Sequence, residues 1–392
     1  MRWEPDRLQA AGACALFWIV QMLDTEPTNF NSYLLLGAYG ALALGIVTIA
    51  TRINTWLVLG YIGAVGIGLR LLQPVITQSD VWRSTLEAIS TLLSGSDPYS
   101  HSFTSTTPPG SPFPYLPGAM LYGILQNGWW NGLALNDKPA AIVVVICFVI
   151  VGRIYGPGLA ALGASLYASS ELVIWRSLDG SNDTALAALI AVGVVLLAFA
   201  RDGGLKPSLR RSFYIGSAVM FGWALGFKAL AWPVYPFVAL AIPAEERKAW
   251  LAISLGSFGL LCLPFFIWDP PAFVHQIWLG FTYHTTVWGL DIWNAIEHIR
   301  PGTLAGLGGF ALGSGVFVFG LTAMLLWRQK PATLGEGIIR GAALLAIMLA
   351  MPRWSTTSYY VYAAAIVGLG VACFGSGRSA AVEPPPVDVT AV

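Results

Sequence analysis

Long apolar stretches, separated by short polar segments, run through almost the whole chain. Most of them are close to the roughly 20 residues that a helix needs to cross a hydrocarbon core, and none alternates apolar and polar residues as strands do. Because backbone amides in lipid must be satisfied within a segment, the pattern predicts membrane-spanning helices. We expect about twelve spans, at residues 8–23, 32–50, 55–76, 139–155, 157–176, 183–200, 212–227, 229–243, 249–268, 303–327, 337–352 and 358–374.

The composition agrees with this pattern. Of the 392 residues, 56% are hydrophobic and only 10% are charged, which is too little polar surface for a soluble protein. The predicted fold class is therefore an all-α polytopic membrane protein, with one transmembrane domain over residues 1–374. The proline-rich end, 375–392, is expected to be a disordered tail. The net charge of +1 and the lack of a cationic stripe argue against a nucleic-acid partner.

The positions of the cations predict the topology. Most Lys and Arg residues fall on the side of the N-terminus, which places both termini in the cytoplasm of a multi-pass cell-membrane protein. Two larger loops, 77–138 and 269–302, then lie on the outer face together with most of the acidic residues. The run 116–135 contains Gly128-Trp129-Trp130-Asn131 and is interpreted as an interfacial helix, because a crossing there would put the cations of 201–211 outside. Any chemistry is expected on the outer face.

The first outer loop opens with the most informative polar residue of the chain. Asp80 stands just past an apolar run, where an acid is a candidate functional group. Asp80, Arg83 and Glu87 fall on one face of a predicted helix. Two interpretations compete for Asp80: a catalytic base, or a surface acid paired with Arg83.

Two segments resemble a known family. The sequence Leu92-Leu93-Ser94-Gly95-Ser96-Asp97-Pro98-Tyr99, followed by Tyr115-Leu116-Pro117, resembles the first outer loop of GT-C glycosyltransferases, polytopic enzymes that use polyprenyl-phosphate sugars. Gly180-Ser181-Asn182-Asp183 and the later Gly222-Trp223-Ala224-Leu225-Gly226-Phe227-Lys228 resemble bacterial mannosyltransferase-like members. The resemblance covers about residues 55–245. It implies a GT-C-like bundle with an outer loop domain carrying interfacial helices, and transfer of a hexose, mannose, from a polyprenyl phosphate in the cell envelope.

The chain departs from the family in two places. Asp80 lies between Ser79 and Val81, whereas related transferases carry an acidic pair there, and Trp130 is followed by Asn131 where oligosaccharyltransferases have an aspartate. The resemblance therefore implies a single aspartate as base, without a divalent metal or another cofactor. The four histidines likewise show no metal-ligand spacing.

The reaction sets the candidate roles. An acceptor hydroxyl needs a general base, for which Asp80 is the candidate, and a leaving prenyl phosphate needs cations, for which Lys228 and Arg353 are the candidates. Lys228 stands at the expected bend of a hairpin formed by residues 212–243. The predicted substrate cavity is lined by Arg83, Glu87, Tyr99, Tyr115 and Asp183.

Each role has a structural alternative. Lys228 is equally well interpreted as a lysine that reaches lipid headgroups, and Arg353 as an ordinary interfacial anchor. For Asp183 the favoured interpretation is a cap on a helix starting at Thr184.

The expected partners follow from the implied reaction. They are a polyprenyl-phosphate sugar, membrane lipids, and a glycolipid, polysaccharide or protein acceptor. The competing functions are a multispan transporter or lipid flippase, although the chain lacks the related halves common in transporters, and a non-catalytic scaffold.

Overall fold

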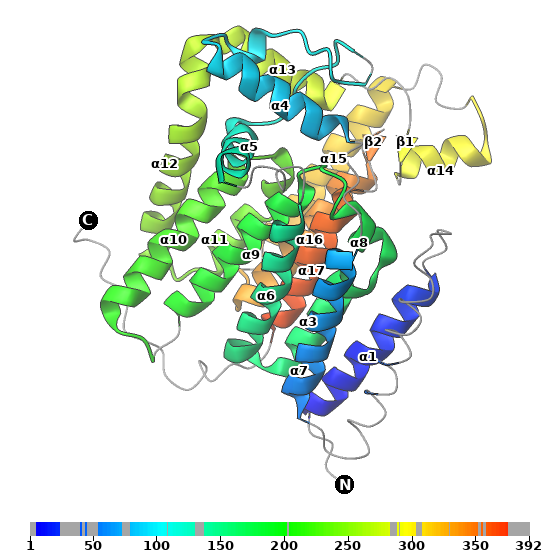
Figure 1. The fold of residues 1–392 in the computed structure, drawn as a ribbon, viewed down its shortest axis with the longest axis vertical. Coiled ribbons are helices and arrows are strands. Elements are labelled where there is room, and N and C mark those ends of the chain that lie inside the picture. Colours follow the sequence, from blue (N-terminus) through cyan, green and yellow to red (C-terminus); the bar gives the residue numbers. More distant parts are fainter. Residues whose placement is uncertain are drawn as a thin grey trace.

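The computed structural model shows a helical protein with two layers (Figure 1). It describes residues 5–23, 40, 44, 54–72, 79–107, 109–129, 137–201, 204–282, 288–289, 291–302, 308–328, 330–351, 354–355 and 358–374. The expected span at 32–50 and the expected tail at 375–392 lie largely or wholly outside these residues, and so does Arg353.

The lower layer in Figure 1 is a bundle of apolar helices. Its elements are α1 (Pro5–Leu23), α3 (Thr55–Leu72), α6 (Lys138–Tyr155), α7 (Pro157–Ser169), α8 (Glu171–Arg176), α9 (Asp183–Ala200), α10 (Pro207–Leu225), η2 (Ala229–Ala231), α11 (Tyr235–Ala241), α12 (Ala244–Trp268), α15 (Gly308–Trp327), α16 (Leu334–Ala350) and α17 (Tyr359–Ala372). Helix α9 is hydrophobic all round and packs against α6, α10 and α17, so it forms the centre of the core. Gly163 of α7 and Gly368 of α17 let these two helices touch backbone to backbone.

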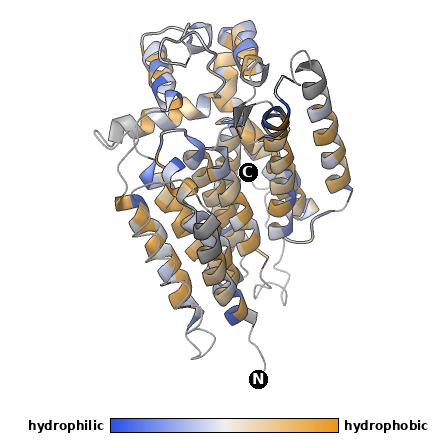
Figure 2. Cartoon of the chain, turned by 90° about the vertical axis from the view of Figure 1, so that its right-hand side faces the viewer, coloured by the Kyte–Doolittle hydropathy of each residue, from blue (hydrophilic) through white to orange (hydrophobic). Residues whose placement is uncertain are grey.

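The bundle confirms the predicted fold class, an all-α polytopic membrane protein. By length and composition, α3, α6, α9 and α12 can each cross a membrane, and shorter apolar helices lie beside them. Figure 2 shows hydrophobic residues along the length of the bundle helices. On the outside of α12, Leu260 and Ile267 are exposed, as expected for side chains that face lipid.

The upper layer is built from the two large loops, 77–138 and 269–302, and the short connection between α16 and α17. It contains α4 (Asp80–Leu93), η1 (Pro98–Ser100), α5 (Pro117–Trp129), α13 (Pro270–Thr282) and α14 (Ile292–Ile299), with a short parallel pairing of β1 (Trp288–Gly289) and β2 (Trp354–Ser355). Helix α12 reaches from the bundle to this layer, where α13 follows it (Figure 1). Helix α5 lies within 116–135, the run that the sequence assigns to an interfacial helix.

Two expected spans are broken in the structure. The stretch 157–176 divides at Ser170, whose hydroxyl accepts a hydrogen bond from the amide of Val173 and starts α8. The stretch 229–243 contains only η2 and the seven-residue α11, because Pro233 and Pro236 interrupt the helical hydrogen bonds. A helix of seven residues is about 10 Å long, so 229–243 does not form a full-length span, which agrees with a hairpin at 212–243 that is too short for two such spans.

Candidate functional site

Lys228 lies at the turn between α10 and η2 and forms a buried ion pair. Its backbone is extended (φ −157°, ψ 144°), and its Nζ donates a hydrogen bond of 2.6 Å to Oδ1 of Asp183. Lys228 is only 7% exposed and Asp183 is fully buried. The predicted bend is therefore present, but the lysine points into the protein, not toward headgroups.

Asp183 does not cap its helix. Helix α9 begins at Asp183 itself, and the preceding Asn182 has a left-handed backbone (φ 61°) and makes no side-chain capping bond. Nζ of Lys228 lies 3.3 Å from Oδ1 of Asn182 and closer still to Asp183. The prediction that Asp183 caps a helix from Thr184 is therefore wrong: Asp183 is the counter-ion of Lys228 instead. A buried ammonium without a counter-ion costs several kcal/mol, which is more than one helix cap contributes.

Two aromatic rings complete the surroundings of the lysine. Nζ of Lys228 lies 4.8 Å from the ring centroid of Tyr359 and 5.4 Å from that of Tyr115, within cation–π range. The segment that carries Tyr115 is tied to the lysine turn by hydrogen bonds from the amide of Leu116 to the carbonyl of Phe227 (3.3 Å) and from the amide of Gly118 to that of Gly226 (2.7 Å). The outer loop and the bundle thus meet at Lys228.

Gly118 is required for this approach. A Cβ at Gly118 would lie 2.6 Å from the carbonyl oxygen of Gly226, closer than any side chain tolerates. Burial raises the pKa of Tyr115 well above its usual value, and the charges of Tyr359, Asp80, Asp183 and Asp179 add to the shift. The phenol therefore lies within electrostatic range of both Asp80 and Asp183.

Asp80 is the first residue of α4, directly after the N-cap Ser79. It is half-buried, and its Oδ2 accepts a hydrogen bond of 3.2 Å from the amide of Thr107. Arg83 is exposed on the same helix, and no ion pair between the two appears within the described residues. The geometry leaves the second carboxylate oxygen of Asp80 without a protein partner in the described part of the chain.

Glu87 anchors the loop that covers α4. Its two carboxylate oxygens accept hydrogen bonds from the amides of Thr104 (3.0 Å) and Ser105 (2.9 Å) and from both hydroxyls, and Oε1 lies 2.9 Å from Nε2 of His101. Partial burial alone would raise the pKa of Glu87, but the bonds from Ser105, Thr104 and His101 outweigh it and lower the pKa to about 2. Glu87 holds loop 101–107 in place and thereby the Thr107 amide on Asp80.

Replacing Glu87 with Gln is expected to loosen this loop by about 1–3 kcal/mol, because one carboxamide cannot accept from all these donors. The pKa of Glu87 is lowered on folding, so its contribution to stability is present above the usual 4.5 and is lost as pH falls through about 2. Hydrogen exchange at Thr104 and Ser105 measures the effect. Glu245→Gln, at an exposed position of α12, is the control, and unchanged exchange in Glu87→Gln would contradict the anchoring role.

Tyr99 lies in an aromatic core, not on a cavity wall. It is 1% exposed, its ring centroid lies 4.8 Å from that of Phe273 in α13, and its hydroxyl donates to the carbonyl of Tyr115 (2.8 Å). Tyr99 therefore holds the backbone of Tyr115, whose ring contacts Lys228. Of the eight residues predicted for the site, Tyr115 and Asp183 contact Lys228, and the charge of Asp80 acts on Tyr115. Arg83 and Glu87 lie on α4 with Asp80, Tyr99 lies behind Tyr115, and Arg353 is outside the described residues.

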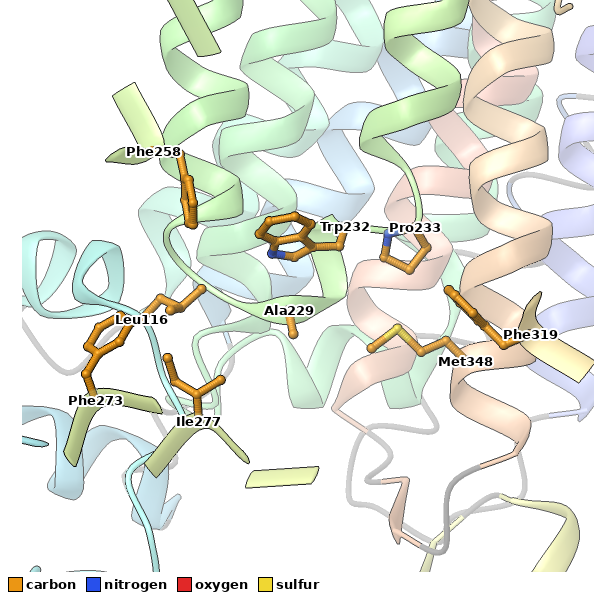
Figure 3. Close-up of a pocket in the computed structure, with 9 residues that line it drawn as sticks. All are labelled: Leu116, Ala229, Trp232, Pro233, Phe258, Phe273, Ile277, Phe319 and Met348. Carbon is orange, nitrogen blue, oxygen red and sulfur yellow. The ribbon is translucent and has the colours of Figure 1, made fainter. Parts of the chain in front are cut away.

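A cavity of about 350 Å³ lies beside Ala229, Trp232 and Pro233, which follow Lys228 in the chain (Figure 3). All its lining residues are apolar: Leu116, Ala229, Trp232, Pro233, Phe258, Phe273, Ile277, Phe319 and Met348. Ala229 follows Lys228 in the sequence and Leu116 follows Tyr115, so the charged centre and the apolar cavity share two backbone segments. Sequence reasoning expected a lipid groove near Lys228 but missed the residues that line it, because they come from six separate segments. The one local signal was Trp232-Pro233, soon after Lys228.

The structure also places two unpredicted acids near this centre. Asp179 and Asp137 are 6% and 3% exposed. Burial, followed by the charge of Asp183, raises the pKa of Asp179, although the hydrogen bonds from Ser181 and the charge of Arg176 oppose the shift. Within the described ranges, no group of three or more His, Cys, Asp or Glu side chains is arranged to hold a metal ion.

No protein-family model matches the chain, and no curated protein matches it. Among solved structures, the chain is similar to ArnT from Cupriavidus metallidurans in the apo state, with 14% identity and a TM-score of 0.49 over 85% of this chain and 59% of that one. It is also similar to ArnT from Cupriavidus metallidurans bound to undecaprenyl phosphate, with 16% identity and a TM-score of 0.48 over 84% and 60% of the two chains. The chain thus spans about three fifths of the length of the structures it matches.

Proposed function

We propose that the protein is a GT-C type membrane glycosyltransferase that moves a hexose, mannose, from a polyprenyl-phosphate donor to an acceptor hydroxyl. The observation that carries the proposal is that Lys228, a buried cation, is directly followed in the chain by Ala229, which lines an apolar cavity. A ligand that fits both has an anionic headgroup and a long hydrocarbon chain. The sequence resemblance to polyprenyl-phosphate-dependent transferases supports the same choice.

The prenyl chain would occupy the cavity between η2, α12, α13, α15 and α16. Trp232 is 45% exposed on its wall, so the cavity can exchange a chain with lipid. At the polar end, an ammonium has three N–H donors. Within the described residues Lys228 directs its donors at Asp183 and Asn182, which leaves one for a phosphate oxygen. Arg353 is proposed as the second cation, since it precedes β2 and Tyr359 in the sequence.

The acceptor would be activated from the other side. In the proposed step the acceptor hydroxyl gives its proton to the carboxylate of Asp80, and its oxygen forms a bond to the anomeric carbon as the bond from that carbon to the phosphate oxygen breaks. The prenyl phosphate leaves with the bonding electrons, and Lys228 stabilises the added negative charge. Tyr115, in range of both groups, would face the sugar between them. Arg83, exposed on α4, would meet the acceptor.

The proposed orientation places this site on the outer face of the cell membrane, with both termini in the cytoplasm. The acceptor would then be a glycolipid, polysaccharide or protein outside the cytoplasm.

The decisive experiment is sugar transfer in proteoliposomes. Purified protein is mixed with radiolabelled mannosyl- or glucosyl-phosphoprenol and with host lipids or envelope protein as acceptor. Label in a new covalent product supports the transferase. Label that crosses the bilayer while still on its prenyl phosphate contradicts it and supports a transporter or flippase.

Filling the cavity is expected to weaken binding of the prenyl-phosphate donor. In Ala229→Phe the added ring takes space from the prenyl chain, and losing the burial of about two methylene groups, about 1.6 kcal/mol, raises the donor KM roughly tenfold. Leu260→Phe, on the lipid-facing side of α12 and 80% exposed, is the matched control. An equal rise in KM for both variants would show that the cavity does not hold the chain.

A further inference from the structure

Arg70, in the last turn of α3, is a fully buried arginine that forms no ion pair with an acid in the described part of the chain. Helix α3 is long and apolar enough to cross a membrane. A buried cation without an acid costs free energy, and an apolar side chain of similar volume is often the more stable choice. An arginine at this position is therefore expected to make contacts that an apolar side chain cannot make.

The guanidinium joins three helices that lie side by side, α3, α7 and α8 (Figure 1). Nη1 of Arg70 donates to the carbonyl of Gly66 on α3 (3.0 Å), and Nη2 donates to the carbonyl of Tyr167 on α7 (2.8 Å). Nε donates to Oγ of Ser177, the C-cap residue of α8 (3.2 Å). Cζ also lies 4.4 Å from the ring centroid of Tyr167. Among cationic side chains, only the planar fork of arginine presents donors in directions that reach three elements at once.

Ser177 connects this fixed group to the start of α9. Its carbonyl accepts a hydrogen bond of 3.2 Å from Oγ1 of Thr184, which closes the turn between α8 and α9 into a loop. Asn182 and Asp183, which hold Nζ of Lys228 with one oxygen each, lie within this closed turn. The guanidinium is therefore connected to the buried ion pair through these hydrogen bonds.

The turn needs such support because its backbone is strained. Among the residues that the structure describes, Asn182 is the one non-glycine residue with a positive φ (61°). A non-glycine residue in this region persists only where its surroundings fix it. Lys228 binds the turn at Asn182, and Arg70 binds it at its first residue, Ser177. If the contact at Ser177 is lost, the turn can relax and change the direction in which the lysine presents its remaining N–H group.

We propose that Arg70 is a positioning residue for the donor phosphate. By holding the turn between α8 and α9, it fixes the two oxygens that orient the ammonium of Lys228 toward the phosphate. The inference rests on the proposed function, because it assumes that Lys228 binds phosphate. Arg70 acts through the turn and not on the ligand, because its own donors are directed at the protein.

The position of the turn is tested first, without ligand. In Arg70→Lys the charge stays but one ammonium cannot reach all three helices, so hydrogen exchange of the amides over 178–186 should become about tenfold faster. The matched control is Arg247→Lys on α12, since Arg247 also donates to several backbone carbonyls, those at the end of α11. This control should leave exchange over 178–186 unchanged. Equal exchange in the wild type and Arg70→Lys would overturn the proposal.

Phosphate binding is tested next, with a polyprenyl monophosphate that carries no sugar. Arg70→Lys should raise the Kd about tenfold, the loss expected for one hydrogen bond from a charged group, while Arg247→Lys keeps the wild-type Kd. Thr184→Val removes the hydrogen bond to Ser177 at nearly the same shape and leaves the guanidinium in place, and it should also raise the Kd. The double variant Arg70→Lys with Thr184→Val should bind no more weakly than the weaker single variant, because both substitutions act through one turn.

A wild-type Kd in Arg70→Lys would overturn the proposal, and so would effects of the two substitutions that add in the double variant. If Arg70→Lys does not fold, Thr184→Val decides, and an unchanged Kd in that variant overturns the proposal. Failure of the proposed function gives a different result. The prenyl phosphate then binds equally well to the wild type and to Lys228→Met with Asp183→Asn, although exchange over 178–186 still responds to Arg70→Lys.

Discussion

Asp80→Asn is expected to lower the turnover number for sugar transfer about 10²–10⁴-fold, the usual contribution of a general base, and to leave donor binding unchanged. The amide oxygen of Asn still accepts the hydrogen bond from the Thr107 amide, so loop 101–107 should stay in place. The variant removes the basic oxygen and little else. Transfer of radiolabelled sugar in proteoliposomes measures the turnover number. The affinity for a polyprenyl phosphate shows whether donor binding is unchanged.

The matched control is Asp97→Asn. Asp97 is also an acid of the upper layer, and its oxygens accept hydrogen bonds from the Tyr99 amide and the Ser100 hydroxyl, which an amide can partly keep. It should transfer sugar at close to the wild-type rate. If Asp80→Asn remains as active as Asp97→Asn, Asp80 only holds the loop through the Thr107 amide and the base must be another acid.

Lys228→Met is expected to have the second large effect, on stability as well as activity. The substitution leaves Asp183 buried without its cation, and removing one partner of a buried ion pair typically costs about 3–5 kcal/mol. Transfer should be lost, because the leaving phosphate no longer meets an ammonium. Thermal unfolding in detergent and the transfer assay give the two readouts.

The double variant Lys228→Met with Asp183→Asn separates structure from function. With both charges gone, the uncompensated carboxylate is removed and most of the stability should return. Transfer should still be absent. A double variant that is stable and active would show that the pair serves only folding, and the phosphate role of Lys228 would then be wrong.

The apolar pattern alone was enough to predict much of the bundle. The span expected at 183–200 is α9 to the residue, and the expected span at 139–155 begins one residue late, because in lipid the length of an apolar run determines the length of its helix. The bend at Lys228 was also predictable, since Pro233 and Pro236 interrupt the second half of its hairpin.

The assignment of polar partners was not predictable in this way. From the sequence, Asp80 had Arg83 as its natural neighbour and Asp183 had the helix that follows it; in the structure they contact the Thr107 amide and Lys228 instead. The sequence by itself determined the helices and the places where polar residues interrupt them, because those depend on neighbours within a turn or two. Only the tertiary structure decided which acid meets which cation, because a buried charge selects its partner by packing across the whole fold. It also decided that Ala229, beside the lysine in the chain, lines an apolar cavity, because the other walls come from distant segments.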